Sequence, residues 1–140
     1  MRICGVELSG NDAVICLLNL EKQQFNIPDC RARKLSLAKE HGREELVQFQ
    51  AAFAKLMSDY SVDKVVIKGR LTKGKFAGGA ASFKLEAAIQ LIANLDVQVL
   101  NTSQLKAAIA ENPCPIQFAD TGLKQFQEAA FTVAYAAHAA

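Results

Sequence analysis

The sequence lacks three features: a run long enough to span a membrane, a secretory signal and closely spaced pairs of cysteines. No apolar run approaches the ~20 residues that a membrane-spanning helix needs. No secretory signal precedes the first apolar stretch, which starts at once with Arg2 and Ile3. No CxxC pair occurs among the four widely spaced cysteines, so the spacing argues against a zinc site. We therefore expect a cytoplasmic protein with reduced thiols and no membrane partner.

The sequence also has little excess charge and no sign of a second domain. Sixteen basic and fourteen acidic residues give a net charge of +2, which argues neither for nor against a nucleic-acid partner. There is no internal repeat and no long linker, and 51% of the residues are hydrophobic. We expect a single domain over residues 1–140. Since neither histidine lies near a serine or cysteine in sequence, nothing indicates a nucleophilic triad.

The first third of the chain has the pattern of β-strands. Apolar runs at residues 3–8 and 13–20 are separated by Ser, Gly, Asn and Asp, which favour a tight turn and predict a β-hairpin. A third strand is expected between residues 24 and 37, with limits blurred by Pro28. Glu7 therefore stands near the end of the first strand, just before a turn.

Helices and strands alternate in the rest of the chain. Apolar residues at helical spacing predict a helix from Glu44, a second over residues 81–92, a short third from Thr102 or Ser103 through residue 109, and a final helix. The expected apolar face of the final helix consists of Leu123, Phe126, Ala130, Val133, Ala134 and Ala137. Buried strands are expected at residues 65–67 and 97–100. The order βββ-α-β-α-β-α-α indicates an α/β fold with a mixed five-stranded sheet and helices on both faces.

Four segments resemble the RuvC-type nucleases, the bacterial Holliday-junction resolvases of the ribonuclease H-like superfamily. ICGVELSG at residues 3–10 is similar to that family's opening Gly-Ile-Asp-Pro-Gly, and AASFKLEAA at 80–88 to its helix beginning Ser-Ala-Leu-Lys-Leu. VQVLNTSQLKAA at 97–108 is similar to its Pro-Val-Phe-Glu-Tyr strand and Gln-Val-Lys helix. EAAFTVAYAAH at 128–138 is similar to its closing Asp-Ala-Ala-Asp-Ala-Leu-Ala helix. The resemblance implies a ribonuclease H-like fold, and we expect a small bacterial family within that superfamily.

The four catalytic acids of that family fall on Glu7, Lys68, Glu128 and Phe131. Hydrolysis with two metal ions requires several converging carboxylates. An ammonium at Lys68 would repel a cation and neutralise Glu7, and Phe131 has no ligand atom. The pattern disfavours an active two-metal nuclease and predicts a non-catalytic domain without a cofactor.

Two other interpretations of these residues stay open. The first is a residual nuclease, in which Glu7 and Glu128 hold one weakly bound Mg²⁺ or Mn²⁺ ion. In the second, Glu7 is an ordinary strand-end carboxylate paired with Lys68, and Glu128 is a solvated helix residue. In either case, we expect Glu7 and Lys68 to lie at adjacent strand ends within ion-pair reach.

A basic, glycine-rich segment follows the strand at 65–67. No acid occurs between residues 64 and 84, and the candidate phosphate-binding residues are Lys68, Arg70, Lys73, Lys75 and Lys84. Glycines in such a segment let phosphate approach backbone amides as well as side chains. We expect nucleic acid or a protein as the partner, against the alternative of a basic face that serves solubility. The sequence does not name the substrate or the oligomeric state, so a homo-oligomer stays open.

Residues 69–75 within this segment fit the pattern GxxxxGK of a phosphate-binding P-loop. However, Phe76 stands where a P-loop has the Ser or Thr that binds Mg²⁺. The chain also lacks the strand-end Asp that would complete the magnesium site, since the strands at 65–67 and 97–100 run into Lys68 and Asn101. The sequence therefore disfavours nucleotide hydrolysis.

Overall fold

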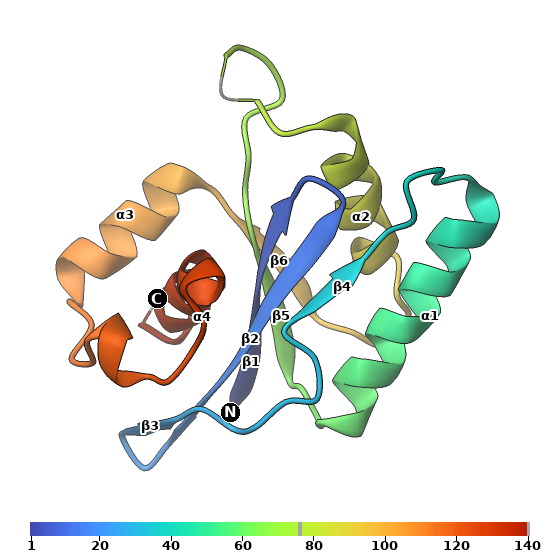
Figure 1. Ribbon diagram of the computed structural model, residues 1–140. Coiled ribbons are helices and arrows are strands. Elements are labelled where there is room, and N and C mark those ends of the chain that lie inside the picture. The colour runs from blue at the N-terminus through green and yellow to red at the C-terminus, as the bar shows by residue number, and fades with distance from the viewer. Residues whose placement is uncertain (76, 140) are drawn as a thin grey trace.

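A computed structural model describes residues 1–75 and 77–139 of the chain. A twisted sheet lies in the middle of the molecule, with helices α1 and α2 on one face and α3 and α4 on the other (Figure 1). The strand order is β3-β2-β1-β5-β6, and β4 also pairs with β2. No helix in the described part of the chain is long and apolar enough to cross a membrane.

The hairpin expected at the start of the chain is present. Strands β1 (Arg2–Ser9) and β2 (Asp12–Glu21) pair antiparallel, with Glu7 opposite Val14. Gly10 in the turn has φ +59°, a conformation that glycine adopts at no steric cost. Both strands are buried over most of their length because each face of the sheet is covered by helices.

The third strand is divided, so the sheet has six strands instead of the expected five. Strand β3 (Gln24–Asn26) pairs with one end of β2, and β4 (Lys34–Ser36) pairs with the other. Seven residues, 27–33, lie between the two segments, whereas only four, 15–18, separate the matching positions of β2. Because three residues are in excess and Pro28 has no N–H to donate, the chain bulges away from β2 between the two short strands.

The remaining elements follow the predicted order. Helix α1 (Arg43–Asp59) leads to β5 (Lys64–Lys68), which pairs parallel with β1, and α2 (Ala80–Gln90) leads to β6 (Val97–Leu100), which pairs parallel with β5. Helix α3 (Thr102–Glu111) begins with a capping box of Asn101 and Gln104. Two 3₁₀ turns, at Phe118–Asp120 and Gln125–Gln127, precede α4 (Glu128–Ala139).

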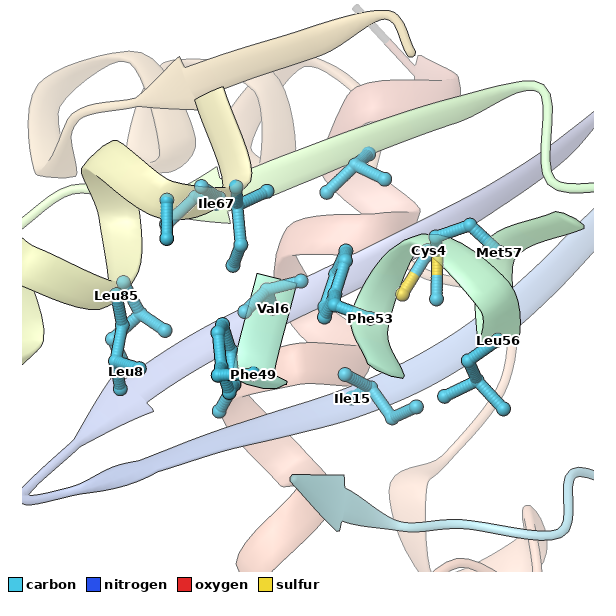
Figure 2. Close-up of a cluster of buried hydrophobic side chains, with 14 of the residues drawn as sticks. Cys4, Val6, Leu8, Ile15, Phe49, Phe53, Leu56, Met57, Ile67 and Leu85 are labelled. Atoms are coloured by element: carbon cyan, nitrogen blue, oxygen red, sulfur yellow. The ribbon is translucent and has the colours of Figure 1, made fainter. Parts of the chain in front are cut away.

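The alternation of side chains along β1 divides the core into two clusters. Cys4, Val6 and Leu8 face α1 and α2 and pack against residues such as Phe53 and Leu85 (Figure 2). Ile3 faces the opposite way and packs with the buried residues of α3 and α4. All four cysteines are free, and burial raises the pKa of the Cys16 thiol to about 12.

Helix α4 lies directly on β1 because Gly5 leaves room for it. A Cβ at this position would stand 2.0 Å from the carbonyl oxygen of Ala130 and 2.8 Å from the Cβ of Ala134. Small residues on both elements therefore allow the helix backbone to approach the strand. At the last turn, His138 Nε2 lies 2.7 Å from the Leu18 carbonyl, so this histidine packs against β2.

The final helix begins later than its apolar pattern predicted. Leu123 and Phe126 were expected on its buried face, but both precede α4, and Phe126 is 47% exposed. The cause is a long-range contact of Gln127, which is 4% exposed and donates from its side chain to the Ile15 carbonyl at 2.9 Å. That bond fixes a 3₁₀ turn at residues 125–127, and the turn leaves the Phe126 ring outside the core.

Candidate functional site

A row of side chains crosses the sheet on the face covered by α4. Val14 on β2 pairs with Glu7 on β1 at one side and with Lys34 on β4 at the other. Paired residues of antiparallel strands point to the same face, and Val14 belongs to the cluster under α4. Val6 on β1 pairs with Ile67 on β5, so the next residues, Glu7 and Lys68, stand side by side. Lys68 therefore extends the row beyond Glu7. We call Lys68, Glu7, Val14 and Lys34 the cross-strand row.

Glu7 and Lys68 are brought together as the sequence predicted. Lys68 Nζ lies 4.0 Å from Glu7 Oε2, and the two side chains are 35% and 30% exposed. The prediction of adjacent strand ends on one face is therefore confirmed. Because both groups are partly solvated and the distance is at the limit for an ion pair, this contact adds only about 0–1 kcal/mol to stability.

Glu128 is exposed at the first residue of α4. Its carboxylate accepts a hydrogen bond from the Gln125 amide at 3.1 Å. A negative charge in the first turn also interacts favourably with the helix dipole. Glu128 thus has a local structural role whether or not it also meets a ligand.

Phe131, one turn further along α4, is 4% exposed. Its ring packs against that of Phe118 with a centroid distance of 5.9 Å. The side chain belongs to the hydrophobic cluster between α4 and the sheet. Across residues 1–75 and 77–139, no group of three or more His, Cys, Asp or Glu residues is arranged to hold a metal ion.

Arg70 is held within the fold, although the sequence analysis placed it among the phosphate-binding residues. Its side chain is 11% exposed and pairs with Glu86 at 3.3 Å. The guanidinium donates to Ser82 Oγ at 3.1 Å and to the Lys68 carbonyl at 3.2 Å, and it lies 4.4 Å from the centre of the Phe83 ring. Arg70 therefore fastens the end of β5 to α2, and the acid that pairs with it lies just beyond the acid-free segment.

The lysines of the basic segment do not all face the same way. Lys84 Nζ lies 2.9 Å from His41 Nδ1 and donates to the His41 carbonyl at 3.3 Å, so Lys84 joins α2 to the loop before α1. Lys73 and Lys75 are exposed in the loop that projects beyond the sheet in Figure 1. Of the candidate residues, these two and Lys68 border the end of the sheet where Glu7 lies.

The P-loop pattern does not produce the geometry of a P-loop. In that motif the Gly-Lys pair opens a helix, whereas α2 begins only at Ala80. Gly74, with φ +98°, lies in a loop ahead of Gly78, whose N–H donates to the Leu71 carbonyl at 2.8 Å. Phe76, the residue at the Ser or Thr position, lies outside the described residues.

Sequence reasoning missed an aromatic ring at one end of the cross-strand row. Lys34 Nζ lies 5.8 Å from the centre of the Phe126 ring, within the range of a cation–π interaction. The two residues are 92 positions apart in sequence. The helical spacing assigned Phe126 to the core, so no local signal indicated this pair.

Two solved structures of one protein are similar to this chain over nearly its whole length. Thermus thermophilus RuvC matches with a TM-score of 0.77 and 9% identity over 99% of this chain and 94% of that one. The same protein in complex with a Holliday junction substrate matches with a TM-score of 0.73, over 99% and 93% of the two chains. These likenesses confirm the ribonuclease H-like fold.

Comparison with protein-family models gives a family for this chain. No curated protein matches the chain in sequence. A family model described as "Protein of unknown function (DUF3010)" matches residues 1–137. Since that match spans nearly the whole sequence, the chain belongs to the DUF3010 family.

Proposed function

We propose that this chain is a RuvC-like domain that binds nucleic acid without cleaving it. The observation that carries the proposal is the placement of Lys68 Nζ 4.0 Å from Glu7 Oε2. An ammonium at that distance competes with any divalent cation for the same carboxylate. In the resemblance to the RuvC-type nucleases, the Lys68 position belongs to a metal-binding acid.

The surroundings of Phe131 support the same proposal. A second metal-binding acid of the family corresponds to this residue, whose ring is packed against Phe118 inside the core. A carboxylate placed there would lose hydration unless it turned toward solvent. The Glu7 and Glu128 carboxylates alone supply too few oxygen ligands for two divalent ions.

Nucleic acid is favoured as the partner by the charge at this end of the sheet. Lys68 and Lys34 stand at the two ends of the cross-strand row, and the exposed Lys73 and Lys75 follow in the loop after β5. The Thermus thermophilus RuvC with this fold was solved with a Holliday junction substrate. Because lysines contact phosphates more than base edges, we expect weak binding with little sequence preference.

The test is a salt titration of binding to a fluorescent four-way junction, a duplex and a single strand. Lys73→Ala with Lys75→Ala should weaken binding to unrelated sequences equally and flatten the salt slope by about two. The control is Lys55→Ala with Lys106→Ala, which removes the same charge from exposed positions on α1 and α3. Equal effects of both double variants would contradict a role for the loop. A lack of binding to all three probes at low salt would favour a protein partner.

The alternative function is a residual metal-dependent nuclease that uses Glu7 and Glu128 with Mg²⁺ or Mn²⁺. Glu128 favours it because its carboxylate is exposed at the start of α4. Incubation of the same probes with each metal and gel analysis for cleavage tests it directly. Cleavage that is abolished by Glu7→Gln would overturn the non-catalytic proposal.

Calorimetry with Mn²⁺ tests whether Lys68 suppresses metal binding. Lys68→Glu should produce measurable heat of Mn²⁺ binding, because it replaces the competing ammonium with a second carboxylate near Glu7. Lys64→Glu is the matched control, since Lys64 stands at the other end of the same strand. Heat from neither variant, with both folded, would remove the argument that Lys68 replaces a metal ligand.

The sequence makes four further predictions about this protein that we include in the proposal. They are one domain over residues 1–140, a cytoplasmic location, a bacterial source and self-association into a homo-oligomer. The binding experiment does not depend on any of the four.

A further inference from the structure

Phe126 is an exposed aromatic side chain beside the face described above. The residue is 47% exposed, although its C-terminal neighbour, Gln127, is buried. The Gln127 side chain bonds to the Ile15 carbonyl, and this bond anchors the turn to β2. Phe126 is therefore presented to solvent on a fixed turn rather than on a loose loop.

A cation lies next to this ring. Lys34 Nζ is 5.8 Å from the ring centre, and the Lys34 side chain is 53% exposed. Its charged neighbour is Asp12, whose Oδ2 lies 3.8 Å away and whose Oδ1 accepts a hydrogen bond from Ser36 Oγ at 2.6 Å. The ammonium is thus weakly held and accessible to an incoming anion.

The pair stands at the opposite end of the cross-strand row from the basic loop. Lys34 on β4 and Lys68 on β5 are three strand spacings apart, or about 14 Å at 4.7–4.9 Å per spacing. Both positions lie at the carboxyl end of β1, on the same face of the sheet.

We propose that Phe126 and Lys34 hold one unpaired nucleotide, with the base stacked on the ring and a phosphate beside the ammonium. This inference rests on the proposed function and adds a preference for single-stranded nucleic acid over duplex. An aromatic face recognises any base because every base has a π-face, whereas a paired base inside a duplex cannot reach it. A neighbouring cation is the complementary group for the phosphate of the same strand.

The test compares binding of a labelled oligothymidine and of a blunt duplex of equal length. Phe126→Ala should raise the Kd for the single strand about tenfold and leave the duplex Kd within about twofold. Phe126→Tyr should restore single-strand binding, because its ring also stacks. Lys34→Ala should reduce the single-strand salt slope by about 0.7.

Matched controls separate this site from general effects of charge and exposure. Arg31 is 51% exposed and lies 5.6 Å from the centre of the Tyr60 ring, so Arg31→Ala removes a similar cation–aromatic pair elsewhere. Leu91→Ala removes a side chain of a residue that is 77% exposed. Neither control should change single-strand binding. If Phe126→Ala fails to fold, Phe126→Leu takes its place in the binding comparison, because leucine keeps an apolar side chain without a ring.

The outcomes distinguish this inference from the proposed function. Wild-type binding to both probes, with no loss in Phe126→Ala or an equal loss for both probes, would overturn the stacking site and leave nucleic-acid binding intact. No wild-type binding to either probe would overturn both. A selective single-strand loss in Phe126→Ala, with recovery in Phe126→Tyr, would support both.

Discussion

The two ends of the sheet differ in how firmly their charged residues are held. At the amino end of β1, the Arg2 side chain donates to Asn19 Oδ1 at 2.8 Å and to the Tyr60 carbonyl, and the Arg2 N–H donates to Asp63 at 2.7 Å. The N-terminal ammonium also donates to the Leu20 carbonyl at 3.0 Å. These bonds join β1, β2 and the end of α1, so the charges at this end maintain the fold.

The carboxyl end of the same strand has charges with longer contacts. Glu7 and Lys68 are 4.0 Å apart and Lys34 and Asp12 are 3.8 Å apart, and all four side chains are at least 30% exposed. The loop with Lys73 and Lys75 projects from this end. Loosely held charges contribute little to stability but can exchange their partners for a ligand. The comparison therefore indicates a structural role for the amino end and is consistent with the binding role that we propose for the carboxyl end.

The largest expected effect concerns the helix that covers both ends. Gly5→Ala should lower the free energy of unfolding by about 3 kcal/mol or more, because the new Cβ would overlap the Ala130 carbonyl. Gly79→Ala is the control, since a Cβ there would meet nothing within 4 Å. Urea unfolding of both variants measures the difference. Similar losses in the two variants would mean that α4 can move away from β1 at little cost.

The second prediction compares the two ends directly. Arg2→Ala should cost about 2 kcal/mol, because it leaves the Tyr60 carbonyl and Asn19 without their donor. Lys68→Ala should change stability by less than about 0.5 kcal/mol. Nucleic-acid binding should show the reverse order, with the larger loss in Lys68→Ala. If Arg2→Ala weakened binding more than Lys68→Ala in the folded state, the division between the two ends would be wrong.

Arg70 lies at the carboxyl end of the sheet and is nevertheless held firmly, unlike Lys68 and Lys34. Arg70→Lys should cost about 1 kcal/mol, since an ammonium cannot reproduce the bonds to Ser82 and Glu86 and the stacking on Phe83. Lys73→Ala is the control, with a change below about 0.5 kcal/mol. Thermal melts of the two variants check this prediction. An Arg70→Lys variant as stable as the wild type would mean that these contacts contribute little and that Arg70 is available to a ligand.

The smallest expected effect is a pH dependence from the amino end. Burial lowers the pKa of His138 below its usual value, so the unfolded state binds more protons as the pH falls below about 6.5. The stability that this histidine contributes is therefore present above that pH and is lost as the pH falls through its folded pKa. Melting temperatures between pH 7 and about 5 should fall more steeply in the wild type than in His138→Gln. Parallel curves for the two proteins would mean that other groups dominate the dependence.

Local patterns in the sequence predicted most of the elements. The strand at 97–100 has the predicted bounds, and the strand at 65–67 extends by one residue at each end. The Glu7–Lys68 contact was predicted from the resemblance to the RuvC-type nucleases, which places both residues at adjacent strand ends. These features depend on residues near one another in sequence or on a known arrangement of strands.

The features that escaped prediction depend on distant partners. The start of α4 depends on the bond between Gln127 and Ile15, which are 112 positions apart, and that bond exposes Phe126. The third strand is divided because the seven residues 27–33 lie opposite only four residues of β2. This difference appears only once the strand register is known. Arg70 seemed available to a ligand because no acid lies near it in sequence. Its partner, Glu86, is 16 positions away, beyond the acid-free segment 64–84. Each case involves pairing across elements, which hydrophobic periodicity does not encode.

The contact between Gly5 and α4 also has a consequence for synthesis of the chain. Strand β1 is made well before α4, with about 120 residues between them. At about 5–20 residues per second, roughly 6–24 s pass before the helix exists. During that interval the apolar side of the hairpin that carries Ile3 and Leu18 lacks α4 as its cover. We therefore expect ribosome-bound chains that end before residue 128 to bind chaperones that recognise exposed apolar strands.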